Sequence, residues 1–350
     1  MTERSALHGG LARFAFITEG GSEVGLGHVA RCTALARAVA GAGARVGFLV
    51  VPDPPVLALL RGEWADVVPV PWTIDPRAAR GALRSWEADV VVVDGYSAGP
   101  EFLSALRSVA GQVVAVDDGA DRALPVDVVV NGGLWAERLP YRRTPDTVFL
   151  LGPRYALLDP HYAEPPRRPD RERMRRALIC LGGGRHEDAI LKVLGAVDAA
   201  LDDCAVDVAV GPFSQDWPRL DAAARSTRHE VSIHRDCFGL RDLMLAADVA
   251  ISGGGVTLYE LAATATPAVV VLTADNQARN AEGFERAGAA LAVGVAGDAA
   301  LGESLATALS RLAHDHALRA TMGARGRALV DGEGALRVAA ALAHLPISRR

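Results

Sequence analysis

Short runs of apolar and β-branched residues recur along the chain, and segments with apolar residues at helical spacing separate them. Near-continuous Val and Ile runs without polar alternation are typical of parallel strands buried on both faces of a sheet. In the first half we predict strands at 14–17, 45–51, 89–94, 112–117, 126–130 and 148–151, with helices at 33–42, 76–87 and 100–110.

The same alternation restarts at residue 177. We predict strands at 177–181, 206–210, 231–234, 248–251 and 267–272, helices at 187–201, 240–247, 257–265, 278–288 and 298–313, and a closing helical region up to Leu345. Prolines among charged residues at 159–176 would break both helix and sheet. We therefore expect α/β architecture with two Rossmann-like, doubly wound domains facing a cleft, at 1–163 and 177–350, joined by a linker at 164–176. The last helix would pack back on the N-terminal domain.

Composition narrows the class of protein. The chain has 350 residues, 37 basic against 42 acidic side chains and a net charge of -5, which argues against bulk binding to nucleic acid. Its four cysteines form no Cys-x-x-Cys pair, as expected of reduced thiols in a cytoplasm. Residues 1–10 lack a signal-peptide core, and no uncharged apolar run approaches the ~20 residues that cross a bilayer. We expect a cytoplasmic protein without membrane anchor, metal or cofactor, and leave its oligomeric state open.

A glycine-rich turn follows the first predicted strand. Gly25 and Gly27 allow a tight turn and a close approach of ligand to the main chain, and His28 stands at the start of the next helix. The positive end of that helix favours a neutral, basic imidazole, which suits a general base. Glu19, in the same loop, could orient His28 or an acceptor. The alternative is an ordinary strand-to-helix turn with a half-buried histidine.

Two more glycine turns follow strands in the second half, at 182–184 and 253–255. Neither is the Gly-x-Gly-x-x-Gly of nicotinamide sites, and the P-loop pattern is absent. Backbone amides at 253–255 and at the next helix start could hold a diphosphate. Glu260, one turn on, would accept hydrogen bonds from a ribose, or it would serve as capping-box partner of Thr257.

Polar side chains follow several predicted strands at their carboxyl ends, the edge that faces the ligand in such sheets. They include Tyr96, Asn276 and Gln277, with a simple turn signal as the alternative for the last two. Asp117 and Asp118 occupy a similar place, with a simple helix cap as the alternative.

These motifs together resemble those of the nucleotide-sugar hydrolases of pseudaminic acid biosynthesis and their spore-coat-polysaccharide relatives. The likeness extends in order over nearly the whole chain, through segments 25–32, 94–96, 117–118, 151–158, 180–183, 247–260 and 276–277. It implies a GT-B fold, kinship with the glycosyltransferase that completes lipid II, and a UDP-sugar bound with its nucleotide on the second domain. It also implies that His28 is the catalytic histidine and that Tyr96, Asn276 and Gln277 are active-site residues.

The sequence differs from that family's pattern at positions that would border the sugar. Ile17 and Glu19 replace an Arg and an Asp, glycines replace serines at 20 and 21, and Gly184-Arg185-His186 replaces a Ser/Thr-Asp pattern. Arg185 would suit an acidic sugar because a guanidinium grips a carboxylate bidentately, unless it is an exposed surface arginine.

We therefore expect a metal-independent glycosyltransferase that moves a sugar from UDP to a small acceptor. One version joins a uronic acid to cytosine. The alternatives are a UDP-sugar hydrolase and a silent nucleotide-sugar-binding protein. The predicted catalytic residues are His28, Glu19, Tyr96, Asn276 and Gln277, and the predicted nucleotide- and substrate-binding residues are Gly25, Gly27, Arg31, Gly182, Gly183, Gly184, Arg185, His234, Gly253, Gly254, Gly255, Thr257 and Glu260.

Overall fold

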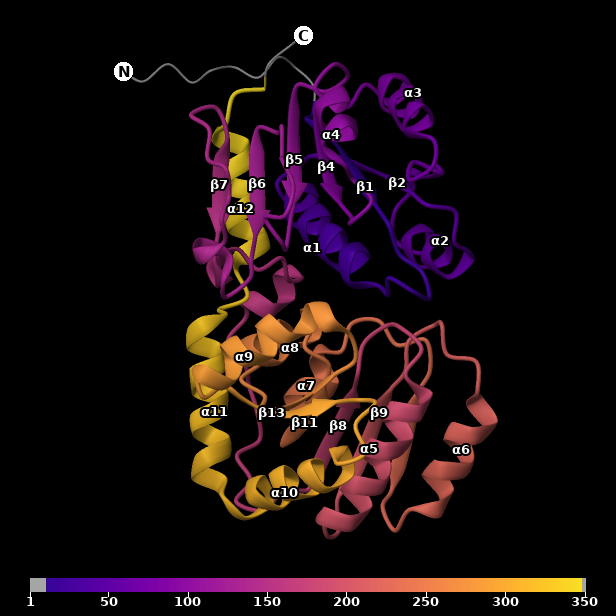
Figure 1. Ribbon diagram of the computed structural model, residues 1–350, viewed down its shortest axis with the longest axis vertical. Helices are drawn as coiled ribbons and strands as arrows, with labels where there is room; N and C mark the ends of the chain where they lie inside the picture. The colour runs from indigo at the N-terminus through magenta and orange to yellow at the C-terminus, as the bar shows by residue number, and fades with distance from the viewer. Residues whose placement is uncertain (1–10, 348–350) are drawn as a thin grey trace.

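The computed structural model describes residues 11–347 as two lobes, one above the other, each built on a parallel sheet (Figure 1). The segment 1–10, which bears on the signal-peptide expectation, lies outside the described residues. The strand order is β3-β2-β1-β4-β5-β6-β7 in the first sheet and β10-β9-β8-β11-β12-β13 in the second. Both orders reverse direction at the first strand of the lobe, as in doubly wound sheets. The predicted α/β fold class is confirmed.

The N-terminal lobe contains the elements β1 (Arg13–Thr18), α1 (Gly27–Gly41), β2 (Arg45–Val50), α2 (Pro54–Arg61), β3 (Val67–Pro69), α3 (Pro76–Trp86), β4 (Val90–Asp94), α4 (Pro100–Leu106), β5 (Gln112–Val116), β6 (Val128–Asn131) and β7 (Val148–Leu151). Sequence analysis missed α2 and β3. Helix α2 has a recognisable start, because the Asp53 side chain accepts a hydrogen bond from Val56 N and a proline follows at once.

The C-terminal lobe contains β8 (Arg176–Cys180), α5 (Glu187–Ala200), β9 (Ala205–Ala209), α6 (Trp217–Ser226), β10 (Val231–His234), α7 (Arg241–Ala246), β11 (Val249–Ser252), α8 (Val256–Ala263), β12 (Ala268–Leu272), α9 (Ala278–Arg286), β13 (Ala290–Val295), α10 (Leu301–His314) and α11 (His316–Leu329). Sequence analysis missed α6 and β13. The closing helical region divides into α11 and a separate helix, α12 (Gly334–His344).

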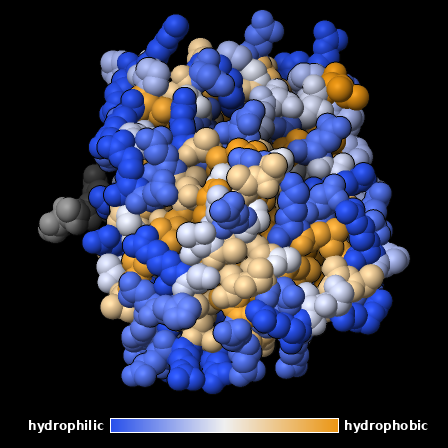
Figure 2. Space-filling view, turned by 60° about the horizontal axis from the view of Figure 1, so that its bottom comes forward, coloured by the Kyte–Doolittle hydropathy of each residue, from blue (hydrophilic) through white to orange (hydrophobic). Residues whose placement is uncertain are grey.

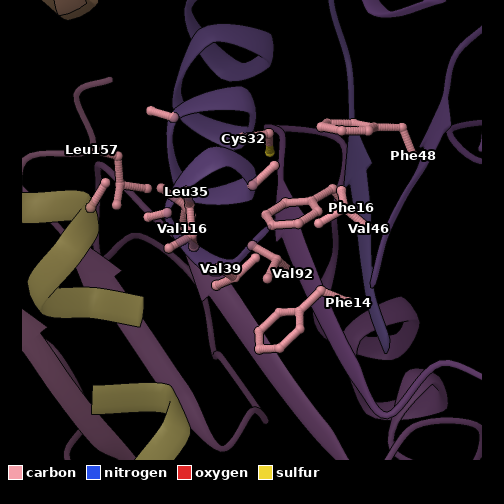
Figure 3. Close-up of a cluster of buried hydrophobic side chains, with 14 of the residues drawn as sticks. Phe14, Phe16, Cys32, Leu35, Val39, Val46, Phe48, Val92, Val116 and Leu157 are labelled. Atoms are coloured by element: carbon pink, nitrogen blue, oxygen red, sulfur yellow. The ribbon is translucent and has the colours of Figure 1, made fainter. Parts of the chain in front are cut away.

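Helix α12 returns to the N-terminal lobe. In Figure 1 it runs beside β6 and β7, and its Val338 and Leu342 belong to the same buried cluster as Leu35 and Val39 of α1. Figure 3 shows part of this cluster between α1 and the strands, with the rings of Phe14 and Phe16 projecting from β1. The chain therefore crosses between the lobes twice.

The first sheet is covered on both faces, which explains its unbroken apolar strands. Phe14 and Phe16 of β1 face the cluster beneath α1, while Ala15 and Ile17 face a second cluster with α3 and α4. On the surface view of Figure 2, hydrophilic side chains cover most of the face and hydrophobic areas lie between them. Among residues 11–347 no helix is both long enough and apolar enough to span a membrane.

The proline-rich segment between the sheets is attached to the C-terminal lobe through its arginines. Arg168 donates to Met244 O at 2.7 Å and to Thr266 Oγ1 at 2.6 Å. Arg319 of α11 donates to the carbonyl oxygens of Arg171 and Glu172, both at 2.8 Å. The segment is therefore more tightly held than the solvated linker we expected, and the domain limits remain a prediction.

Candidate functional site

Helix α1 begins at Gly27, earlier than predicted, and His28 lies in its first turn. The preceding loop closes on itself through the Gly21–Gly25 bridge, and Gly25 has a φ of 77°, which a glycine adopts without strain. No side chain caps the helix, and within residues 11–347 the amides of residues 27–29 have no acceptor. A helix start with free amides favours negative charge in front of it.

The imidazole of His28 is held by Asp94, the last residue of β4. His28 Nδ1 lies 2.6 Å from Asp94 Oδ1, and the two residues are 4% and 0% exposed. They meet because β4 is the neighbour of β1, at the point where the strand order reverses. The sequence places them 66 positions apart, so only the sheet order brings them together.

Arg31 binds the same carboxylate that faces His28 and keeps it an acceptor. Its Nε and Nη2 donate to the two oxygens of Asp94 at 2.9 and 2.8 Å. Burial alone would raise the pKa of Asp94, but the charges and hydrogen bonds of Arg31 and His28 outweigh it and lower that pKa. An ionised carboxylate can only accept, so the contact with Asp94 favours a proton on Nδ1 of His28, whereas Arg31 Nη2, a donor, also lies 2.9 Å from that nitrogen. Nε2 has no partner among residues 11–347 and is not sealed from solvent.

Glu19 does not orient His28, contrary to one of our expectations. Its Oε1 accepts from the backbone amides of Tyr96 at 2.5 Å and Ser97 at 3.3 Å. Glu19 is 5% exposed and lies beneath the turn after β4, where an added Cβ on Gly95 would come within 3.0 Å of its carboxyl carbon. It therefore shapes the turn that carries Tyr96.

Tyr96 joins the two lobes next to His28. Its ring meets the imidazole edge-on at 4.5 Å between centroids. The hydroxyl accepts a hydrogen bond from Asn276 Nδ2 of the C-terminal lobe at 3.0 Å and lies 3.5 Å from Asp118 Oδ2. Asp118 also accepts from Arg31 Nη1 at 2.6 Å. The structure thus brings His28, Tyr96 and Asn276 together, with Asp118, for which a helix cap had been the alternative, beside them.

Gln277 is not directed at His28 but braces the glycine turn after β11. Its Oε1 accepts from Gly254 N and from Thr273 N, both at 3.0 Å. Asn280 Nδ2 donates to Gly254 O at 3.0 Å, so both backbone groups of Gly254 are already bonded. The prediction that all three glycine amides face a ligand is therefore wrong for Gly254.

Free amides remain at the start of α8. The amides of residues 255–257 have no acceptor among residues 11–347, and no side chain caps the helix. Thr257 lies inside α8 and Gly255 is its N-cap, which removes the capping-box interpretation of Glu260. A Cβ added to Gly27 would lie 3.7 Å from Val256 Cγ2, so the starts of α1 and α8 meet across the lobes.

Glu260 lies half-buried on α8 and forms no ion pair within residues 11–347. Burial raises the pKa of Glu260 to about 7, while a hydrogen bond with Tyr162 of the 3₁₀ turn Pro160–Ala163 opposes the shift. At neutral pH its carboxyl group is poised between its two protonation states. The ionised form accepts at both oxygens, so it holds two ribose hydroxyls better than the protonated form, in which one oxygen carries the proton.

The glycine turn after β8 also touches the other lobe. A Cβ on Gly183 would lie 3.0 Å from Leu26 Cβ, and Gly182 has a φ of 115°. A Cβ on Gly184 would meet the imidazole of His186 at 3.0 Å. Arg185 is exposed and lines an open groove of about 1230 Å³ that is built only from C-terminal-lobe residues.

His234 is engaged within its own sheet rather than presented to a ligand. Its Nε2 lies 2.8 Å from Asp207 Oδ1 on the neighbouring strand, and Asp207 also accepts from Arg176 at 2.6 Å. Asp117 accepts from Gly119 N and Ala120 N, which closes a turn; no helix lies among the described residues between β5 and β6, so Asp117 is not the helix cap of our alternative. No group of three or more His, Cys, Asp or Glu side chains suited to a metal occurs among residues 11–347.

Comparisons with known proteins agree with this architecture. Residues 231–331 match the glycosyltransferase family 28 C-terminal domain. The spore coat polysaccharide biosynthesis protein SpsG of Bacillus subtilis is 28% identical over 93% of this chain and 96% of its own length. The UDP-N-acetylglucosamine–N-acetylmuramyl-(pentapeptide) pyrophosphoryl-undecaprenol N-acetylglucosamine transferase of Sorangium cellulosum is 30% identical over 76% of this chain and 67% of its own. The crystal structure of MurG from Acinetobacter baumannii superposes with a TM-score of 0.65 at 18% identity, covering 95% of this chain and 100% of MurG.

Proposed function

The chain belongs to the family of SpsG-like and PseG-like proteins, which is related to the GT-B enzymes that form lipid II, and from this premise we propose a specific reaction. The chain is a glycosyltransferase-like enzyme that depends on a nucleotide sugar. We propose that it breaks the bond between C1 of the sugar and the diphosphate of a UDP-sugar, with His28 as general base. Transfer to a small acceptor is the first candidate outcome.

The observation that carries this proposal is the buried contact between His28 Nδ1 and the carboxylate of Asp94. A hydrogen bond from Nδ1 to Asp94 Oδ1, 2.6 Å away, would leave Nε2 as a base beside Tyr96 and Asn276, where the lobes meet. Nε2 takes the proton of the attacking hydroxyl or ring nitrogen as the new bond to C1 forms. Asp94 stabilises the resulting imidazolium without becoming protonated.

The C-terminal lobe would stabilise the leaving group electrostatically. Negative charge grows on the diphosphate as the bond to C1 breaks, and the free amides of residues 255–257 at the start of α8 would bind it. The uncapped start of α1 comes close to the same place. Glu260 would accept the ribose hydroxyls from its position on α8.

The burial of His28 limits the size of the nucleophile. The side chain is 5% exposed and the Tyr96 ring packs against it, which favours a small nucleophile at Nε2. This observation also favours the second candidate, hydrolysis, in which water takes the place of the acceptor. Both candidates use the same base and leaving group.

Release of UDP from a panel of UDP-sugars, with and without acceptors, tests the proposal. Turnover that needs an acceptor supports transfer, and turnover at a useful rate in water alone overturns transfer in favour of hydrolysis. His28→Ala should lower turnover ~10²-fold or more with little change in UDP affinity. His161→Ala is the matched control, because its imidazole is 75% exposed and pairs with Asp159 outside the site. An unchanged rate in His28→Ala would contradict the assigned base, and UDP binding without any turnover would indicate a silent binding protein.

A further inference from the structure

Carboxylates outnumber guanidinium groups in the hydrogen-bonded cluster around His28. The charged members at the carboxyl ends of β1, β4 and β5 and on α1 are Glu19, Asp94, Asp117, Asp118, Arg31 and Arg122. Four carboxylates and two guanidinium groups leave an excess of negative charge on the N-terminal side of the site. The starts of α1 and α8 offer the opposite polarity nearby.

Asp118 is the carboxylate of this cluster that solvent reaches. Its side chain is 38% exposed, whereas that of Asp94 is 0% exposed and that of Asp117 is 1% exposed. One oxygen is bound by Arg31 at 2.6 Å, and the other lies 3.5 Å from the Tyr96 hydroxyl, which Asn276 of the opposite lobe also reaches. A substrate between the lobes therefore meets Asp118 beside the catalytic histidine.

We infer that Asp118 determines the charge preference for the sugar: it accepts uncharged hydroxyl-bearing sugars or protonated amino sugars and excludes sugars that carry a carboxylate. This inference rests on the proposed function of the His28 site. Arg31 cannot serve a substrate carboxylate freely, because its Nε, Nη1 and Nη2 already donate to Asp94 and Asp118. The carboxylate of an acidic sugar at this point would be repelled by Asp118. Repulsion of this kind is one way in which a site rejects a wrong substrate.

Arg185 does not offset this repulsion. It lines a groove that only C-terminal-lobe residues form, away from His28, where Glu187, Asp188 and Asp216 stand beside Lys192 and Arg219. The acidic sugar that the sequence suggested through Arg185 is therefore disfavoured by the charges around His28.

Calorimetric binding of UDP, UDP-glucose and UDP-glucuronate to the wild-type protein and to Asp118→Asn tests the inference. The two sugars differ only in a hydroxymethyl group against a carboxylate. The wild type should bind UDP-glucose about tenfold more tightly than UDP-glucuronate, the discrimination expected of one like charge a few ångströms away. Asp118→Asn keeps an oxygen for Arg31 and should bring the two affinities within about threefold, while the affinity for UDP changes little.

Asp121→Asn removes an equal charge from the same loop and should keep the wild-type ratio, since Asp121 is 71% exposed and pairs with Arg122. As a measurement that needs no variant, the wild-type preference should shrink as ionic strength rises. Equal or tighter binding of UDP-glucuronate by the wild type overturns the inference, and so does a ratio that neither salt nor Asp118→Asn changes. If none of the three nucleotides binds, the proposed function itself fails and this inference falls with it.

Discussion

Replacement of Asp94 by Asn isolates the electrostatic part of the proposed base. The amide keeps the size of the carboxylate but loses its charge, and a carboxylate 2.6 Å from Nδ1 is what stabilises the imidazolium. Opposite charges about 4 Å apart attract by roughly 4 kcal/mol at the effective dielectric near a protein surface. If about two thirds of that attraction is present when the proton is partly transferred, turnover should fall about 10²-fold, since each 1.36 kcal/mol is a factor of about ten.

Steady-state release of UDP measures the loss, and nitrogen chemical shifts of the His28 ring measure the tautomer directly. Asp94→Asn should bind UDP within about threefold of the wild type, because the free amides of α8 belong to the other lobe. Asp89→Asn is the matched control: Asp89 directly precedes β4, at its opposite end, and holds the backbone amide of Arg13 at 2.8 Å. Turnover of Asp94→Asn within fivefold of the wild type, or a proton on Nε2 of the neutral wild-type imidazole, would refute the argument.

Two further variants examine Glu260 of the C-terminal lobe and the return of α12 to the N-terminal lobe. Because burial raises the pKa of Glu260 to about 7, that side chain is mostly protonated at pH 6 and ionised at pH 8, so affinity for UDP-glucose should rise about tenfold over this interval in calorimetry. Glu260→Gln should bind more weakly and show no such rise, and an identical rise in the variant would remove Glu260 from ribose binding. A Cβ on Gly334 would lie 2.0 Å from Ala156 O, so Gly334→Ala should lower the free energy of unfolding by about 3 kcal/mol in urea. Gly302→Ala on α10 has open space around it and should be neutral or slightly stabilising; equal effects of the two would contradict the contact.

Several elements of this protein could be predicted because their signals are local. Unbroken Val runs mark strands buried on both faces, and glycines before helical spacing mark the turns that carry His28 and the start of α8. The start of α2 was equally readable in Asp53-Pro54, a cap followed by a proline, although we missed it. Strand β3 offered little to read, because it has only three residues.

Amino-acid order alone established the alternation of strands and helices, the glycine turns and the position of His28 at a helix start, because backbone geometry and side-chain period depend on near neighbours in the chain. Which side chain faces His28 was decided by the tertiary structure. Glu19 is nearer in sequence, yet Asp94 holds the imidazole because β4 pairs with β1 in the sheet. The same holds for Gln277, whose oxygen satisfies Gly254, and for the Tyr96–Asn276 bond between residues 180 positions apart. Sheet order and the contact between the two lobes determine these interactions, and neither can be predicted from a short stretch of sequence.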